Sequence, residues 1–234
     1  MCWSFTASGI FAVIGLVAAV YFAYKKESKL LWIPLAFFAL MEALQAATYF
    51  YLGKCFASEN QILTLLSYLH IAFQPIFINA LVMYFIPLRA RKKLFWPVIA
   101  VAALFSVILI VKLYPFAWAG TCSIGTTLCG DTLCSFRGNW HLAWSIPFNN
   151  LGFTMMTYYY LAVFLLPLIY GSWRTTLYSI VLGPLLAIIL TNNHPNEWPA
   201  VWCLLSIAIL LGVAVPFLRK TMRVEKWYFW NYPW

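Results

Sequence analysis

The sequence predicts an all-α membrane protein with seven transmembrane helices. Of its 234 residues, 64% are hydrophobic and only 9% are charged, and the mean hydropathy is +0.84. Soluble domains carry about 25% charged residues, so this composition excludes a soluble protein. Because one span needs roughly 20 apolar residues, seven spans use nearly the whole chain and leave no room for a separate soluble domain.

Seven apolar segments follow one another along the chain and form a single domain. The first has no cation before its apolar core and three lysines after it, which is typical of an uncleaved span and not of a secretory signal peptide. A basic cluster precedes the fourth segment, the longest loop precedes the fifth, and an Asn- and Pro-rich turn precedes the seventh. The predicted spans are 7–24, 30–52, 61–87, 96–113, 150–170, 175–191 and 200–217.

The distribution of charge predicts the orientation of these spans. Twelve of the fifteen Lys and Arg residues follow spans one, three, five and seven: Lys25, Lys26, Lys29, Arg89, Arg91, Lys92, Lys93, Arg174, Arg219, Lys220, Arg223 and Lys226. By the positive-inside rule these stretches are cytoplasmic, so the N-terminus lies outside and the C-terminus inside a plasma or inner membrane. Span flanks and anionic headgroups explain the net charge of +9, and we expect the lipid bilayer, and not nucleic acid, as the partner.

The cysteines fall in or beside the segments predicted to face outward: Cys2, Cys55, Cys122, Cys129, Cys134 and Cys203. An even number of cysteines on an oxidising side predicts disulfides. A bridge from Cys55 to one of the three cysteines of loop 114–149 would tie that loop over the helices. A cysteine-bound zinc ion is the competing interpretation, although the spacings fit no Cys-x-x-Cys pair.

Two ionisable residues, Glu42 and His70, stand near mid-membrane, about ten and nine residues below the outer ends of spans two and three. Gln45 shares a helical face with Glu42, and Gln74 shares one with His70. Burying an ionisable group at mid-membrane costs at least about 2.5 kcal/mol, so such a group marks a functional site. We therefore predict that these four side chains form an outward-opening ligand pocket. The alternative is that Glu42 and His70 only satisfy one another in the core.

Three classes of function remain open. The leading prediction is an integral membrane protein that binds or passes a small polar ligand or ion through this pocket. The second is a zinc-dependent hydrolase of a lipid amide or ester, in which Glu42, His70, His141 and His194 would hold zinc and leave a position for water. Seven-span zinc hydrolases of the alkaline-ceramidase and adiponectin-receptor type are analogues, but the last span here lacks their His-x-x-x-His pair.

The third class is a structural membrane partner protein. Small residues at Ser8, Ala12, Gly15 and Ala19 let a neighbouring helix approach the first span, and we favour internal packing over a dimer seam. Retinal is not expected as a cofactor, because a Schiff base needs a lysine inside a span and segment 200–217 contains none.

Four short motifs give a resemblance to known proteins: Met1-Cys2-Trp3-Ser4, Met41-Glu42-Ala43-Leu44-Gln45, His70-Ile71-Ala72-Phe73-Gln74-Pro75 and Asn196-Glu197-Trp198-Pro199. With these motifs the chain resembles an uncharacterised family of small seven-span membrane proteins. The resemblance covers most of the chain and implies membership and topology, without an activity.

Overall fold

The computed structural model describes residues 4–192, 194–212 and 215–225, and the structural statements below concern these residues. Two residues used in the sequence predictions, Cys2 and Lys226, lie outside them, as does the opening Met-Cys-Trp motif.

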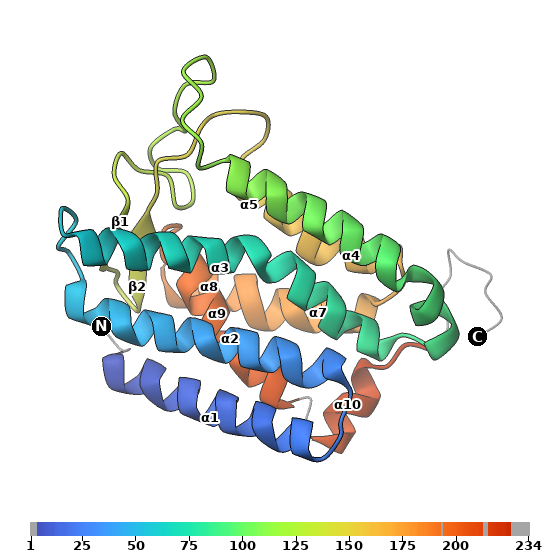
Figure 1. The fold of residues 1–234 in the computed structure, drawn as a ribbon. Coiled ribbons are helices and arrows are strands. Elements are labelled where there is room, and N and C mark those ends of the chain that lie inside the picture. Colours follow the sequence, from blue (N-terminus) through green and yellow to red (C-terminus); the bar gives the residue numbers. More distant parts are fainter. Residues whose placement is uncertain (1–3, 193, 213–214, 226–234) are drawn as a thin grey trace.

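Helices make up most of the described chain (Figure 1). They are α1 (Phe5–Tyr24), α2 (Lys29–Thr48), α3 (Ser58–Val82), α4 (Leu88–Val111), α5 (Met155–Tyr160), α6 (Leu166–Ile169), α7 (Trp173–Ile180), α8 (Leu186–Leu190), α9 (Trp198–Gly212) and α10 (Pro216–Met222). Short 3-10 turns, η1 (Tyr49–Tyr51) and η2 (Met83–Phe85), extend α2 and α3. Two π-helical segments, η3 (Leu161–Leu165) and η4 (Val181–Leu185), join α5 to α6 and α7 to α8.

Five of the described helices are long and apolar enough to cross a membrane: Phe5–Tyr24, Lys29–Tyr51, Ser58–Phe85, Leu88–Val111 and Trp173–Leu190. Two shorter apolar helices, Met155–Ile169 and Trp198–Ile207, coincide with the fifth and seventh predicted spans. These helices indicate a membrane protein whose surface is compatible with contact with lipid.

Two helix ends differ from the predicted spans. Helix α4 begins at Leu88, so it includes the basic cluster that the sequence prediction placed before the span at 96. A helix can continue past the hydrocarbon layer because Lys and Arg side chains there reach the polar interface. At the other end of the chain, α9 ends at Gly212 and a separate helix starts at Pro216, a residue favoured at the first helical position.

The prediction of a purely α-helical protein is wrong in one region. Strand β1 (Cys134–Arg137) pairs antiparallel with β2 (Leu142–Ser145), with Ser135 opposite Trp144 and Phe136 opposite Ala143. Each strand has only four residues, too few for a period-two pattern to be distinguished from an irregular loop in the sequence. Hydrogen bonds to neighbouring segments and a disulfide hold the hairpin in place.

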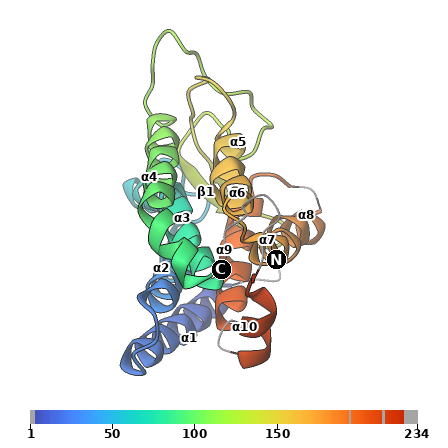
Figure 2. The same cartoon turned by 90° about the vertical axis from the view of Figure 1, so that its right-hand side faces the viewer.

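The hairpin and α10 lie at opposite ends of the helix bundle. Figure 1 shows β1 and β2 at the end where α1 begins and α10 near the opposite end of α1, and Figure 2 views the bundle from the α10 end. There Arg219 of α10 forms an ion pair with Glu27, 3.1 Å from Nη1 to Oε1. The short helix α10 is thereby fastened to the turn that follows α1.

The stripe of small residues on α1 packs inside the protein. Ser8, Ala12, Gly15 and Ala19 are all buried. A Cβ atom added at Gly15 would lie 2.7 Å from the Cβ atom of Ala39 on α2, closer than side chains normally approach. The small side chains therefore allow close packing of α1 on α2, which confirms the prediction of internal packing.

Candidate functional site

Loops at the hairpin end form a folded cap over the bundle. We call residues 112–153 and 191–197, without the undescribed residue 193, the loop cap. Two disulfides hold it, Cys55–Cys134 and Cys122–Cys129. The first joins the turn between α2 and α3 to strand β1, as expected for a bridge from Cys55 to the long loop.

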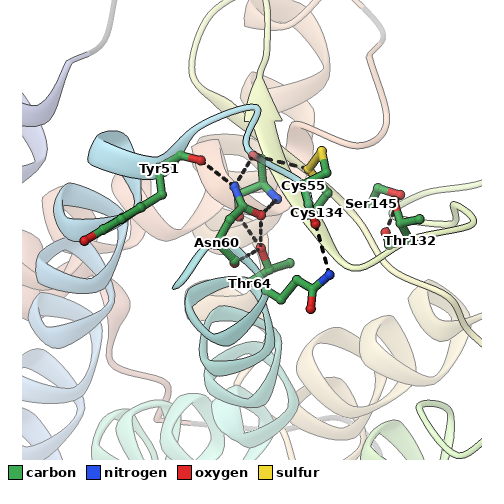
Figure 3. Close-up of a disulfide and its surroundings, with 9 residues drawn as sticks. Tyr51, Cys55, Asn60, Thr64, Thr132, Cys134 and Ser145 are labelled. Atoms are coloured by element: carbon green, nitrogen blue, oxygen red, sulfur yellow. Dashed lines mark hydrogen bonds between the residues drawn. A yellow bond between two sulfur atoms is a disulfide. The ribbon is translucent and has the colours of Figure 1, made fainter. Parts of the chain in front are cut away.

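The amide side chain of Asn60 docks β1 onto α3 (Figure 3). Its Nδ2 donates to the carbonyl oxygens of Tyr51, at 2.7 Å, and Ser135, at 2.8 Å, and its Oδ1 accepts from the Ser135 N–H at 2.9 Å. The Thr64 hydroxyl lies 2.7 Å from the Ser135 hydroxyl. The buried strand thus finds polar partners on α3, as buried backbone groups require.

A second docking point uses the carboxylate of Glu197, just before α9. This side chain is 0% exposed and accepts hydrogen bonds from three consecutive backbone N–H groups, those of Asn139, Trp140 and His141. A Cβ atom at Gly138 would lie 2.6 Å from the Glu197 carboxyl carbon, so glycine is required there. The sequence places this residue in the polar Asn- and Pro-rich turn before the last predicted span, and in the structure it holds the hairpin turn to the start of α9.

Neighbouring polar residues complete the attachment of the cap. Asn196 accepts from the Leu128 N–H through Oδ1 at 2.8 Å, and its carbonyl accepts from the Trp144 N–H at 3.0 Å. Lys112 at the end of α4 donates through Nζ to the carbonyl of Leu151 at 2.9 Å. Each of these groups has a specific partner, so the cap is a fixed part of the fold.

His141 lies fully buried inside the cap. Its Nδ1 is 2.6 Å from the hydroxyl of Tyr49 on η1, and the two rings stack. Burial lowers the pKa of His141 to about 3, because the charged imidazolium is poorly solvated in this position. The ring is therefore neutral at physiological pH.

The four predicted zinc ligands do not come together. Glu42 and His70 belong to the bundle, His141 is bonded to Tyr49 in the cap, and His194 is exposed. Among the described residues no three His, Cys, Asp or Glu side chains are close enough to hold a metal ion. The loop histidines do not descend towards Glu42, because the cap fixes one of them and the other faces outward.

Glu42 and Gln45 lie one turn apart on α2, and both side chains are 0% exposed. Within the described residues neither carboxylate oxygen of Glu42 and neither polar atom of the Gln45 amide has a hydrogen-bond partner. Ser8 of α1 lies beside the Glu42 carboxyl, and the Cys203 thiol of α9 is within its electrostatic reach. We call Ser8, Glu42 and Gln45 the Glu42 cluster.

Gln74 connects this region to α5 and α9. Its Nε2 donates to the Cys203 sulfur at 3.1 Å, and its Oε1 accepts from the Tyr159 hydroxyl. Cys203 is a free, buried thiol, so the disulfide predicted for it is not formed. Its position inside the bundle keeps it away from the cysteines of the cap. The polar chain runs from Glu42 through Cys203 and Gln74 to Tyr159.

His70 lies apart from the Glu42 cluster. Its Nε2 is 2.8 Å from the Phe37 carbonyl oxygen, and its ring stacks on Phe37 with centroids 3.7 Å apart. The ion pair found among the described residues joins Arg219 and Glu27, so Glu42 and His70 are not paired. Equal depth does not bring them together, because α2 presents Phe37 towards His70 and Glu42 towards α1 and α9.

Beside the polar chain lies a small aromatic pocket whose cavity volume is about 20 Å³, room for about one water molecule. We define it by its lining residues, which come from α3, α5, η3, η4 and α9: Ile71, Met156, Tyr159, Tyr160, Phe164, Pro184, Trp198, Pro199 and Trp202. Tyr159 belongs both to this wall and to the polar chain. A second hollow in the cap shares Met156 and Trp198 with the aromatic pocket, so the two adjoin.

Both π-helical segments contribute to the aromatic pocket, through Phe164 of η3 and Pro184 of η4. Proline removes a backbone donor and widens a helix locally, and π-helical turns occur frequently at functional sites. A Cβ atom on Gly183 would overlap the Trp202 ring, so this glycine is what allows the ring to pack on η4. The pocket is therefore built from irregular helix geometry as well as from ring shape.

Sequence reasoning identified Glu42, Gln45 and Gln74 but missed the aromatic pocket. The missing signals were Pro167, which follows η3 in α6, and Gly183-Pro184, which lies inside η4. Aromatic residues alone gave no signal, because tryptophan and tyrosine are also common at membrane interfaces.

Comparison with known proteins gives one result. A family model described as "Family of unknown function (DUF5765)" matches residues 6–223. No curated protein and no solved structure matches the chain. The match extends from α1 to α10 and includes the loop cap and the Glu42 cluster. The chain therefore belongs to this family of unknown function.

Proposed function

We propose that this protein crosses the membrane seven times, with its N-terminus outside, and binds a small organic ligand in the aromatic pocket. The seven apolar helices and the basic residues at one end of the bundle support this topology. The loop cap would then face the outside of a plasma or inner membrane, and its disulfides fit an oxidising compartment.

The observation that carries the proposal is the position of Tyr159 between the aromatic pocket and the polar chain. Ligand sites are mostly apolar cavities with a few placed polar groups, and a ligand larger than water would enter this one by moving its aromatic rings apart. Here the rings form the apolar wall, and the indole N–H of Trp198 has no hydrogen-bond partner within the described part of the chain. This composition suits a ligand with an apolar body and a hydrogen-bond acceptor. The proposed ligand is therefore less polar than the small polar ligand or ion expected from the sequence.

A ligand that enters this pocket would approach from the cap. The hollow shared through Met156 and Trp198 adjoins the pocket on that side. Whether the ligand is only sensed or also passes through the membrane decides between a receptor and a transporter, and both require the same pocket.

Ligands that co-purify with the protein test the proposal. Wild-type protein and Gly183→Ala are purified from native membranes, and bound small molecules are extracted and identified by mass spectrometry. The added Cβ atom overlaps the Trp202 ring, so this ring of the pocket wall has to move and the pocket changes shape. We expect one molecule near equimolar amounts in the wild type and at least about tenfold less in the variant, the loss from about 1.4 kcal/mol of binding energy.

Gly9→Ala is the matched control, because a Cβ atom on Gly9 meets nothing within 4 Å. If Gly183→Ala does not fold, Ile71→Phe fills the pocket from the opposite wall. The proposal is contradicted if the wild type carries no bound molecule, or if the pocket variants retain the same molecules in the same amounts as Gly9→Ala.

A further inference from the structure

The Glu42 cluster differs from Asn79, another buried polar residue of the bundle. Asn79 on α3 is equally buried, but its Nδ2 donates to the carbonyls of Pro75 and Ala162 and its Oδ1 accepts from Tyr170. Glu42 and Gln45 together leave four buried nitrogen and oxygen atoms without a partner in the described chain. Such atoms are costly inside a membrane, so we expect a bound species to interact with them.

The charge of the cluster limits what that species can be. The described basic side chains that are buried lie in or beside the cap, where Lys112 bonds to Leu151 and His141 bonds to Tyr49. Arg219 is paired with Glu27 at the other end of the bundle. Among the residues that the structure describes, no positive side chain therefore compensates Glu42, and one positive charge would neutralise its carboxylate. A divalent ion would leave an uncompensated positive charge in the bundle.

The available donor atoms are hard oxygens, which bind alkali and alkaline-earth cations and do not select transition metals. Two come from the Glu42 carboxylate, one from the Gln45 amide and one from the Ser8 hydroxyl. We propose that the Glu42 cluster binds one monovalent alkali cation. This site lies between α1, α2 and α9 and is separate from the aromatic pocket, so it does not depend on the proposed ligand.

Cation-dependent stability tests this site. The thermal unfolding midpoint of the purified protein is measured while sodium or potassium chloride replaces N-methyl-D-glucamine chloride at constant total chloride. A cation that binds only the folded protein raises the midpoint with a saturable dependence on concentration. We expect a rise of a few degrees with sodium or potassium, and binding of one radioactive sodium ion per protein when sodium is the preferred ion.

Variants at the cluster identify the site. Glu42→Gln is expected to abolish the saturable rise, and Gln45→Leu to weaken the apparent affinity at least about tenfold, because the leucine supplies no oxygen. Glu59→Gln, an equal change at an exposed position on α3, is expected to behave as wild type. If Glu42→Gln does not fold, Gln45→Leu carries the test.

Three outcomes would overturn the proposal. They are no saturable response in the wild type, an unchanged response in Glu42→Gln or Gln45→Leu, and a response to magnesium or calcium but to neither alkali cation. The pocket variant Gly183→Ala is expected to keep the cation response. Loss of the co-purifying molecule with a preserved cation response therefore separates the aromatic pocket from the Glu42 cluster.

Discussion

Two buried carboxyl groups, Glu197 in the loop cap and Glu42 in the helix bundle, have opposite surroundings although both are 0% exposed. Glu197 accepts hydrogen bonds from three consecutive backbone N–H groups. Glu42 and its neighbour Gln45 have no hydrogen-bond partner among the described residues. Identical burial thus accompanies two different environments, one in which three backbone N–H groups donate to the carboxylate and one in which Ser8 of α1 is the polar side chain beside it.

The difference separates a structural role from a functional one. A carboxylate surrounded by donors fixes the chain segments that supply them, and its loss leaves those donors unpaired. A carboxyl group without partners contributes little to folding, and such groups persist at sites where function requires them. We therefore assign Glu197 to the stability of the cap and propose a binding role for Glu42.

The largest expected effect is loss of the Glu197 carboxylate. Glu197→Ala leaves the N–H groups of Asn139, Trp140 and His141 without their acceptor. At about 1 to 3 kcal/mol for each buried unpaired group, we expect about 5 kcal/mol of destabilisation. Thermal unfolding of the purified protein measures this loss, with Glu59→Ala as an exposed control. A loss below about 1 kcal/mol, the contribution of one ordinary hydrogen bond, would refute the structural role of Glu197.

The next largest effect is expected from removing the disulfides. One bridge joins the loop cap to the turn before α3, and the other lies within the cap, so removing each in turn shows which contributes more to stability. Cys55 and Cys134 are 79 positions apart in the sequence, and Cys122 and Cys129 are 7 apart. The loop-entropy model gives about 4.5 kcal/mol for replacing the first pair with serines and about 2 kcal/mol for the second. Unfolding of the two double variants compares them directly. A larger loss of stability from removing Cys122–Cys129 would show that the bridge to the turn before α3 contributes less than the bridge within the cap.

Acid pH should weaken the cap through His141. Its pKa is about 3 in the folded protein and 6.5 as the ordinary value, so the unfolded chain binds more protons between these two pH values. Stability is complete above about pH 6.5 and falls as the pH decreases, by about 2 kcal/mol from pH 7 to pH 5. Unfolding midpoints at these two pH values should differ less in His141→Gln than in the wild type. An equal pH dependence in that variant would exclude His141 as the responsible group.

The smallest effect is expected at the edge of the Asn60 docking point. Thr64→Val removes a hydroxyl that donates to the Asn60 carbonyl oxygen at 2.7 Å and lies 2.7 Å from the Ser135 hydroxyl, and it leaves the bonds between the Asn60 amide and the Ser135 backbone in place. Loss of one such hydrogen bond costs about 1 kcal/mol. Thermal unfolding can resolve this change against the wild type. A loss as large as that of Glu197→Ala would mean that Thr64 also positions Asn60.

Much of the helical part of the fold could be predicted from composition and hydropathy alone. Apolar segments long enough for a membrane leave few alternatives to helices, since backbone groups in lipid must be bonded within the segment. The hairpin at 134–145 could not be predicted, because its position depends on long-range partners such as Asn60 and Glu197 and not on local sequence.

The candidate site was only partly predictable for a related reason. A buried polar residue such as Glu42 or Gln74 is conspicuous in an apolar segment, so depth and polarity identify it. Which helix it faces depends on packing, and this decided against a pair of Glu42 with His70, which contacts Phe37. The aromatic pocket depends on how η3 and η4 depart from regular helix geometry, and hydropathy carries no information about that.

Isosteric replacement of the two carboxyl groups tests the central claim most directly. Glu42→Gln and Glu197→Gln are compared with the wild type by thermal unfolding in sodium- and potassium-free buffer. Glutamine keeps the size of the side chain and removes its charge, so Glu42→Gln should unfold at the wild-type temperature or above it. Glu197→Gln places an amide donor among N–H donors and should unfold well below the wild type. An equal decrease in both variants would contradict the assignment of Glu42 to function and Glu197 to structure.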